Sequence, residues 1–185
     1  MRNKPNEFAR SDGNRLIFRQ TGGDTQGKLL EMEAVYPPHS PKPPAHYHPY
    51  QEEQFQVLAG TFHAQIGDEE KTFVTGDTFS VPANTHHWMH NVSDTEGRLL
   101  WQVRPALQTQ AFFETMWGLA ADGKTNPQGV PNLLQLAVIL RAYAAEFRPS
   151  SPPYLVQRLL FGFLAPIGRL LGYRARYDKY SSRQS

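Results

Sequence analysis

Two histidines and a pair of glutamates in the first third of the chain are spaced as metal ligands. His46 and His48 are separated by one residue, and Glu52 and Glu53 follow after a short bend. On an extended chain, residues two apart point to the same side, so the two imidazoles can share one ion. A carboxylate a few residues further on can supply a third ligand. The segment therefore predicts a metal site.

A second histidine-rich segment, residues 76–91, offers a fourth ligand, because it contains His86, His87 and His90. The chain has no cysteine, which excludes disulfides, thiolate metal sites and thiol catalysis. Histidine and carboxylate ligands without a thiolate suit borderline divalent metals. We expect one divalent transition metal per chain, which is Fe, Mn, Ni, Co, Cu or Zn.

These two segments resemble the paired motifs of the cupin superfamily, whose first motif is G-x5-H-x-H-x(3,4)-E-x6-G and whose second is G-x5-P-x-G-x2-H-x3-N. The resemblance covers about residues 15–105. Ser40 and Asn84 stand where the motifs have glycine, and asparagine tolerates a left-handed backbone better than most residues. The matching residues are His46, His48, Glu53 and Gly60 in the first motif and Gly76, Pro82, His87 and Asn91 in the second.

Only one glutamate and one histidine satisfy both the spacing and the expected direction. Glu53 leaves six residues before Gly60 and shares the strand parity of Phe55, whereas Glu52 does not. His87 alone fits the second motif, and its two histidine neighbours in that segment are expected to point away by alternation. The resemblance implies a metal held by His46, His48, Glu53 and His87. By analogy with the family, Glu53 is also the expected catalytic base.

The resemblance also implies a range of activities. Cupins similar to this chain use such a site for dioxygenation, decarboxylation or isomerisation. The leading hypothesis is an oxygenase-like enzyme that acts on an aromatic or polyketide-like small molecule. The alternative is a non-catalytic cupin that binds a metal or small ligand as a sensor. A closed ligand set, or a site sealed by the helix expected around residues 112–117, would favour that alternative.

Several side chains are predicted to surround the metal or to fill the barrel. The apolar ones either make the core or form a pocket for a hydrophobic substrate. The polar pair His63 and Gln65 either line the pocket or face solvent, since alternation alone does not tell inside from outside. The candidate pocket residues are Phe55, Val57, Met89 and Trp101.

The elements that must position these residues are short strands. Turn signals containing glycine or Ser-Asp separate them, and no helical segment intervenes, which is typical of an antiparallel sandwich or barrel. The fold class is therefore mainly β, and the resemblance implies a double-stranded β-helix, or jelly-roll, over residues 15–105. The expected strands are Leu16–Gln20, Lys28–Tyr36, Gln51–Leu58, Thr61–Ile66, Lys71–Val74, Asp77–Val81, His87–Val92 and Arg98–Val103.

Residues 106–185 are expected to form a helical extension. Phe112 and Trp117 lie on one helical face, and Asn132 can cap a helix that runs to about Phe147. The apolar segment from residue 154 to residue 173 contains Pro166, which predicts two short helices. This extension could cover the barrel, form a lid or make a dimer contact. Its arginines also allow contact with an anionic membrane surface.

Composition and charge set the remaining expectations. Residues 1–140 hold 11 basic and 15 acidic side chains, whereas residues 141–185 hold 8 basic and 2 acidic ones. The basic residues of the tail are interleaved with apolar ones, so no nucleic-acid partner is expected. No apolar run reaches the length of a membrane span, and no secretory signal is recognised, which predicts a cytoplasmic protein. A homodimer is expected, and residues 1–14 are expected to be flexible.

Overall fold

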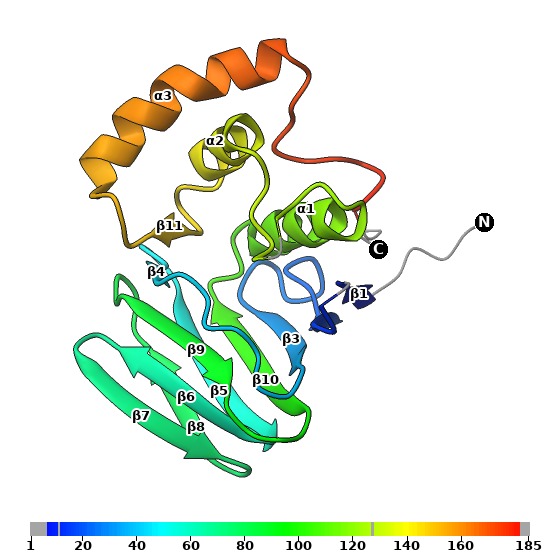
Figure 1. Ribbon diagram of the computed structural model, residues 1–185, viewed down its shortest axis with the longest axis vertical. Coiled ribbons are helices and arrows are strands. Elements are labelled where there is room, and N and C mark those ends of the chain that lie inside the picture. Colours follow the sequence, from blue (N-terminus) through cyan, green and yellow to red (C-terminus); the bar gives the residue numbers. More distant parts are fainter. Residues whose placement is uncertain (1–6, 11, 127, 182–185) are drawn as a thin grey trace.

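The computed structural model describes residues 7–10, 12–126 and 128–181. Two antiparallel sheets pack face to face as a barrel, and three helices lie over one end of it (Figure 1). The protein is therefore mainly β with a C-terminal helical extension, as the sequence predicts. All eight expected strands are present, with shifts of a few residues at their ends.

The sheets differ in size and in what they contribute to the barrel. The larger has the order β1-β2-β3-β10-β5-β8 and the smaller β11-β4-β9-β6-β7. The strands of the larger sheet are Glu7–Ala9 (β1), Arg15–Gln20 (β2), Leu30–Tyr36 (β3), Gly97–Arg104 (β10), Glu52–Ala59 (β5) and Thr78–Val81 (β8). Those of the smaller are Arg148–Pro149 (β11), His46–Tyr47 (β4), His87–Asn91 (β9), Thr61–Ile66 (β6) and Glu69–Val74 (β7).

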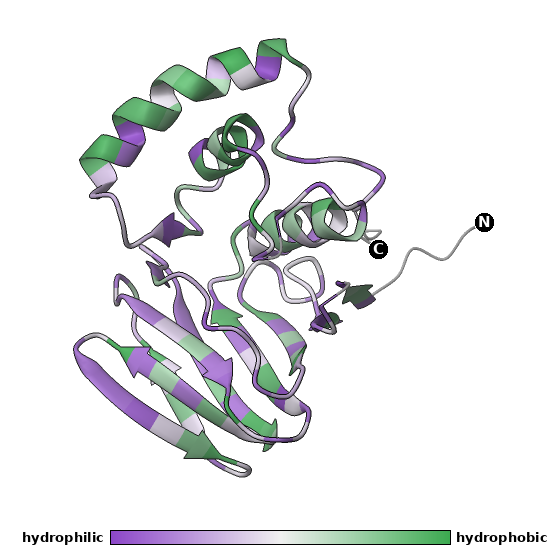
Figure 2. Cartoon of the chain, in the orientation of Figure 1, coloured by the Kyte–Doolittle hydropathy of each residue, from purple (hydrophilic) through white to green (hydrophobic). Residues whose placement is uncertain are grey.

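Alternation along the strands builds the core between the sheets. In β5, every second side chain from Glu53 to Val57 is buried, and the intervening ones are exposed. Figure 2 shows this alternation along the barrel strands and a largely hydrophobic outermost helix. Three of the candidate pocket residues, Phe55, Val57 and Met89, are buried in this core, and Trp101 packs against it. These side chains therefore fill the barrel next to the site.

The two departures from the cupin motifs keep the backbone that those motifs require. Asn84 has a φ of 62°, in the left-handed region that its motif position predicts. The buried Ser40 hydroxyl accepts a hydrogen bond from the Asn91 N–H at 2.9 Å. The neighbouring turn needs glycine, because a Cβ on Gly60, whose φ is +85°, would lie 2.8 Å from the Cα of Gly97.

The three helices are Thr109–Ala121 (α1), Leu133–Ala142 (α2) and Tyr154–Leu170 (α3). Asn132 caps α2 as predicted, since its side chain accepts from the Gln135 N–H at 3.0 Å. The helix expected to reach about Phe147 ends at Ala142, because the chain turns there and residues 148–149 pair with β4.

The expected break at Pro166 is wrong, since α3 is one continuous helix. Proline removes the hydrogen bond to the carbonyl four residues earlier. Pro166 is exposed, so water can reach the carbonyl of Gly162 that loses its donor. The strain of the proline is therefore too small to end the helix.

The N-terminal segment that is expected to be flexible, residues 1–14, contains one element of regular structure. Residues 7–9 form β1, which pairs antiparallel with β2. The ring of Phe8 packs edge-on against that of Phe18 at 5.9 Å, which gives this strand an apolar anchor. Residues 1–6 and 11 lie outside the described residues, as do residues 127 and 182–185 of the extension.

Candidate metal centre

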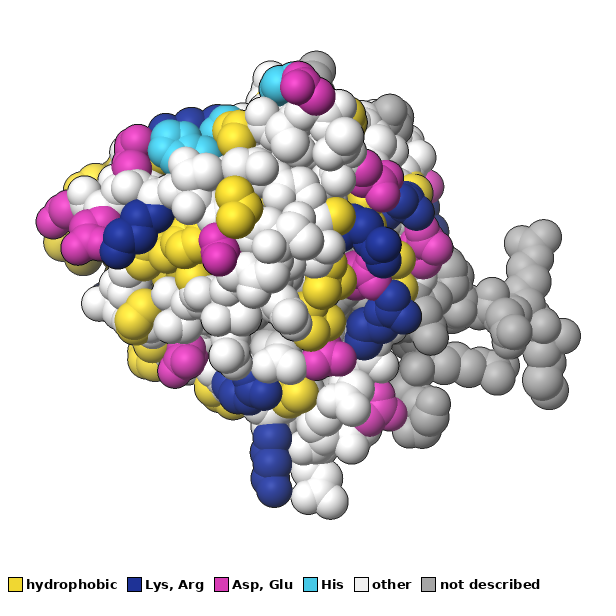
Figure 3. Space-filling model, turned by 90° about the horizontal axis from the view of Figure 1, so that it is seen from below, with side chains coloured by type: hydrophobic (Ala, Val, Ile, Leu, Met, Phe, Trp, Pro, Cys, Tyr) yellow, Lys and Arg dark blue, Asp and Glu magenta, His cyan; other side chains and the backbone are white. Residues whose placement is uncertain are grey.

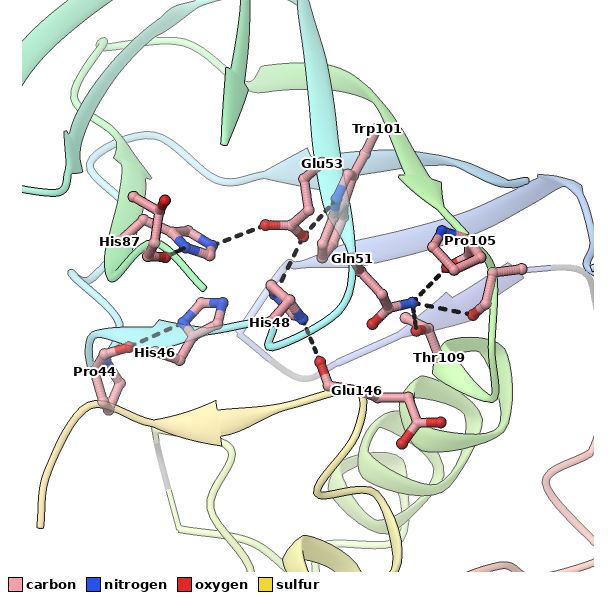
Figure 4. A network of polar contacts seen from close by, with 12 residues as sticks. Pro44, His46, His48, Gln51, Glu53, His87, Trp101, Pro105, Thr109 and Glu146 are labelled. Atoms are coloured by element: carbon pink, nitrogen blue, oxygen red, sulfur yellow. Dashed lines mark hydrogen bonds and ion pairs between the residues drawn. The ribbon is translucent and has the colours of Figure 1, made fainter. Parts of the chain in front are cut away.

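Three histidines converge at the helix-covered end of the barrel, two from neighbouring strands and one from the residue that follows β4 (Figure 4). His46 on β4 is paired directly with His87 on β9, and His48 lies two residues further along the chain. One ring nitrogen from each lies within 4.8 Å of the other two. His48 and His87 are buried, and His46 is half-buried. The structure thus brings together the three histidines that the spacing predicts.

Backbone carbonyls fix the orientation of all three imidazole rings. The Nδ1 of His87 lies 3.0 Å from the Thr85 carbonyl oxygen, and that of His46 lies 3.3 Å from the Pro44 carbonyl oxygen. The Nδ1 of His48 makes a short hydrogen bond with a carbonyl of the helical extension, that of Glu146. A carbonyl accepts, so each Nδ1 carries a hydrogen, and in a neutral ring the Nε2 keeps a free lone pair. Metal-binding histidines are commonly held in this way, because the ring nitrogen that does not bind the metal donates its hydrogen to a carbonyl or carboxylate.

Glu53 completes the polar cluster from the opposite sheet. Its carboxylate is fully buried, with Oε2 2.9 Å from the Nε2 of His87 and Oε1 3.3 Å from the Nε2 of His48. The indole N–H of Trp101 donates to Oε1 at 2.9 Å. The neighbouring Glu52 is exposed, which agrees with the parity argument for Glu53. Glu53 does not belong to the three-histidine group, and its role as a fourth ligand stays a prediction.

Burial and mutual charge set the titration of this cluster. Burial lowers the pKa of His46 well below its ordinary value, and it also lowers that of His48. Burial would raise the pKa of Glu53, but the charges of His48 and His87 outweigh it and lower that pKa to about 2. Burial would lower the pKa of His87, but its contact with Glu53 raises it. One positive charge therefore belongs beside the Glu53 carboxylate.

A divalent metal fits these residues on evidence within the structure. Among the described residues, the Nε2 of His48 is a buried polar atom without a hydrogen-bond partner, and the Oε2 of Glu53 forms no hydrogen bond beyond its ion-pair contact with the Nε2 of His87 at 2.9 Å. Buried acceptors of this kind are costly unless a proton or cation satisfies them. The Nε2 of His87 faces the same carboxylate oxygen, so a shared cation would satisfy all three atoms. The donor set of imidazole and carboxylate suits a borderline divalent ion.

The helical extension forms part of the site. The ring of Phe147 stacks on that of His46 at 4.7 Å and on that of Phe112 at 5.0 Å. Pro149 of β11 pairs with His46, which fixes this segment across the barrel mouth. Phe147 and the carbonyl of Glu146 are the parts of the site that the sequence did not predict. Within residues 112–117, where a lid is expected, Phe112 packs against Phe147, and the role of a lid stays a prediction.

A buried glutamine ties the barrel to the first helix beside the site. The side-chain amide of Gln51 donates to the Pro105 carbonyl at 2.7 Å and to the Thr109 hydroxyl at 2.7 Å. Figure 4 shows this contact beside the histidines and shows the side chain of Glu146 turned away from them. Gln51 thus links the bend that carries His48 to the start of α1.

The other candidate polar residues lie outside the cluster. His86 is exposed, and its Nδ1 lies 2.7 Å from the Ser150 hydroxyl. His90 contacts the Ser40 carbonyl, and His63 lies 3.4 Å from Glu70. The prediction that the flanking histidines of the second motif point away from His87 agrees with these contacts.

The comparisons with known proteins identify the family of the barrel. A family model described as a cupin domain matches residues 32–103. The chain is 32% identical over 101 residues to Protein SchB of Streptomyces halstedii, covering 55% of this chain and 71% of that one. It is 26% identical over 156 residues to an oxidoreductase of Arthrobotrys oligospora, covering 76% of this chain and about 60% of the relative's length. A solved structure, an RmlC-like cupin from Shewanella frigidimarina, matches with a TM-score of 0.48 and 19% identity over 59% of this chain and 91% of that one.

Proposed function

The chain belongs to the cupin family, and on that premise we propose that it is a metal-dependent oxidoreductase of a small molecule. In this proposal one divalent transition metal is held by His46, His48, His87 and Glu53. The observation that carries it is the fixed orientation of three imidazoles around the buried Glu53 carboxylate, with the Nε2 of His48 left without a hydrogen-bond partner among the described residues. The name of the Arthrobotrys oligospora relative supports the reaction class.

A metal held by these residues would supply Lewis acidity toward a substrate or dioxygen. The chain's own residues hold the histidine rings rigid through three backbone carbonyls. They also keep Glu53 in one rotamer through the Trp101 N–H. Preformed ligands of this kind bind a metal with little reorganisation.

Glu53 is better suited to binding than to proton transfer. Its pKa is lowered to about 2, although burial opposes this, because His48 and His87 stabilise the carboxylate. A general base works best with a pKa near the working pH. We therefore assign Glu53 first as a charged ligand, and its sequence-based role as catalytic base is the weaker part of the proposal.

The surroundings of the cluster favour an aromatic or polyketide-like substrate. The rings of Phe147 and Trp101 contact the histidines and the carboxylate directly. Phe147 in turn stacks on Phe112, and Trp101 packs edge-on against Phe113 at 5.1 Å. A flat apolar molecule fits such walls better than a sugar phosphate, which needs cationic partners.

The test is oxygen uptake by the full chain reconstituted with Fe, Mn, Ni, Co, Cu or Zn and supplied with flavonols as probes. We expect turnover that is lost in His48→Ala and strongly reduced in Glu53→Gln, with metal content measured on each sample. The matched control is His86→Ala, which changes an exposed neighbour of His87 and should leave both readouts unchanged. Equal turnover in all variants would contradict the proposal.

A second function is favoured by the closure of the site. Phe147 and the Glu146 carbonyl lie directly over the histidines, which is the feature expected of a cupin that binds without catalysis. The oxygen-uptake experiment also distinguishes the two functions. Stoichiometric metal without oxygen uptake from any flavonol would favour the binding protein.

A further inference from the structure

The outermost helix, α3, has apolar side chains on two opposite faces. Its inner face packs on α2 and buries Phe161 and Ala165. Its outer face carries Leu155, Leu159 and Phe163, which are between 64% and 70% exposed. Their spacing of four residues places them in one row along the helix. Leu170 continues this row and is 88% exposed.

This outer row is long enough to need a partner. A helix of 17 residues extends about 25 Å at 1.5 Å per residue. Monomeric proteins rarely expose a continuous apolar surface of that length unless it binds something. In Figure 1, α3 lies at the edge of the molecule, and no described element covers its outer side.

The charge around α3 has a single sign. From residue 147 to residue 177 the chain has five arginines and no aspartate or glutamate. Arg158 and Arg169 are exposed, lie on α3 beside the outer row, and form no ion pair with the described acidic side chains. The opposite end of the barrel differs, because basic and acidic side chains are interspersed there (Figure 3).

A basic hollow lies alongside the same helix. It has a volume of about 400 Å³ and is formed between α2, the β11 segment and α3. Arg141, Arg148 and Arg158 line it together with Tyr154, and no acidic side chain does. Arginines grouped in this way match the geometry of phosphate groups.

We propose that α3 binds the surface of an anionic phospholipid bilayer, with its outer row in the interface and the arginines on the lipid phosphates. Amphipathic helices with basic flanks bind such surfaces through buried apolar area and charge attraction. Arginine stems let the charged heads reach the phosphates while the helix lies at the apolar boundary. Within residues 7–10, 12–126 and 128–181, no helix is long and apolar enough to cross a bilayer.

A second copy of the chain fits this surface less well. A twofold dimer would pack the outer row of α3 on itself, so the arginines of both copies would meet. The segment from residue 147 to residue 177 offers no acidic side chain to neutralise them. Like charges at an interface oppose association, whereas an anionic bilayer would neutralise Arg158 and Arg169 beside the outer row.

The test is sedimentation of the full chain with vesicles of phosphatidylcholine alone and of phosphatidylcholine mixed with phosphatidylglycerol. We expect binding to the mixed vesicles only, weakened by salt. Phe163→Ser should weaken it about tenfold through lost apolar burial. Arg158→Gln and Arg169→Gln should each weaken it about fivefold. Val74→Ser on β7, also an exposed apolar residue, is the matched control and should have no effect.

Three results would overturn the proposal. The first is no sedimentation with either kind of vesicle. The second is equal binding to both kinds that the arginine variants leave unchanged. The third is a dimer, detected by light scattering, that Phe163→Ser dissociates while vesicles bind nothing, which would make a second copy the partner of α3. None of these results depends on the metal or on catalysis, so they are separate from a failure of the proposed function.

Discussion

At the barrel mouth polar side chains are buried, whereas along the outer face of α3 apolar side chains are exposed. Glu53 and His48 are buried, with the Nε2 of His48 left without a hydrogen-bond partner among the described residues, and Phe163 is 70% exposed. In the free protein, the buried polar groups at the barrel mouth and the exposed apolar side chains of α3 both lower stability. The first can be relieved by an ion and the second by a surface. The two regions therefore indicate two different partners.

Acid should release the metal from the buried cluster at the barrel mouth, and this is the largest effect that we expect. Imidazoles bind metal only when neutral, so protons compete with the ion. Burial lowers the pKa of His46 and His48, which keeps them neutral below the ordinary value of 6.5. We expect the metal to leave progressively between about pH 6 and pH 5. Metal analysis after dialysis checks this, and full retention at about pH 4 would contradict a three-histidine site.

Two phenylalanines of α3 allow the inner and outer faces of this helix to be compared directly. Phe161 is 8% exposed and packs in the core formed with α2, whereas Phe163 is 70% exposed. We expect Phe161→Ala to lower the free energy of unfolding by about 3 kcal/mol. The same change at Phe163 should cost less than about 0.5 kcal/mol. Denaturant unfolding of both variants measures the difference, and equal losses would mean that the outer row is covered in the free protein.

Loss of the hydrogen bond that Trp101 donates to Glu53 should have the next largest effect, a weaker affinity for the metal. Trp101→Phe removes the N–H that holds the Glu53 carboxylate. Changes to such outer contacts weaken metal binding by about 10- to 100-fold, so we expect a loss in that range by competition with a chelator. The matched control is Trp88→Phe, which removes an indole hydrogen bond to Gln65 outside the cluster. Equal metal affinity in both variants would argue against Glu53 as a ligand.

A change to a second buried carboxylate, that of Glu33, should have the smallest effect, and this effect should be on stability alone. Glu33 is buried like Glu53, but Arg19 and Arg98 pair with it. Burial would raise its pKa, yet these two arginines lower it below 4.5. Its contribution is therefore present above about pH 4.5 and is lost as the pH falls through the folded-state pKa. Glu33→Gln should cost about 1 kcal/mol at neutral pH, because both arginines are half exposed.

Unfolding of wild type and Glu33→Gln at neutral and acidic pH measures this contribution. The gap between them should shrink below about pH 4.5, and it should not depend on metal. A gap that widens in acid would contradict the assignment of an ionised Glu33.

The sequence predicted what depends on local spacing. The shared direction of His46 and His48 and that of Glu53 follow from the two-residue periodicity of an extended backbone, and His87 follows from the spacing of the second cupin motif. It did not predict Phe147 or the Glu146 carbonyl, because the contact between His48 and Glu146 spans 98 residues. That contact depends on where α2 ends and on the pairing of β11 with β4, which no local pattern encodes. The hydrogen bond between Trp101 and Glu53, 48 residues apart, was missed for the same reason.

The prediction of a break at Pro166 in α3 was wrong for a different reason. The intrinsic preference of proline argues for a break, but the packing of α3 on α2 outweighs one lost hydrogen bond on the exposed side. The helix could thus be predicted as apolar but not as continuous. Its continuity matters, because it gives the outer row its full length.

The most direct test of the central claim is elemental analysis of the full chain purified without an affinity tag, beside His87→Ala and His86→Ala. His87 lies in the cluster and His86 is its exposed neighbour, so the pair differs mainly in access to the site. We predict about one divalent transition metal ion per chain in the wild type and in His86→Ala, and a loss of most of it in His87→Ala. No metal in any sample after reconstitution, or equal metal in all three, would contradict the account.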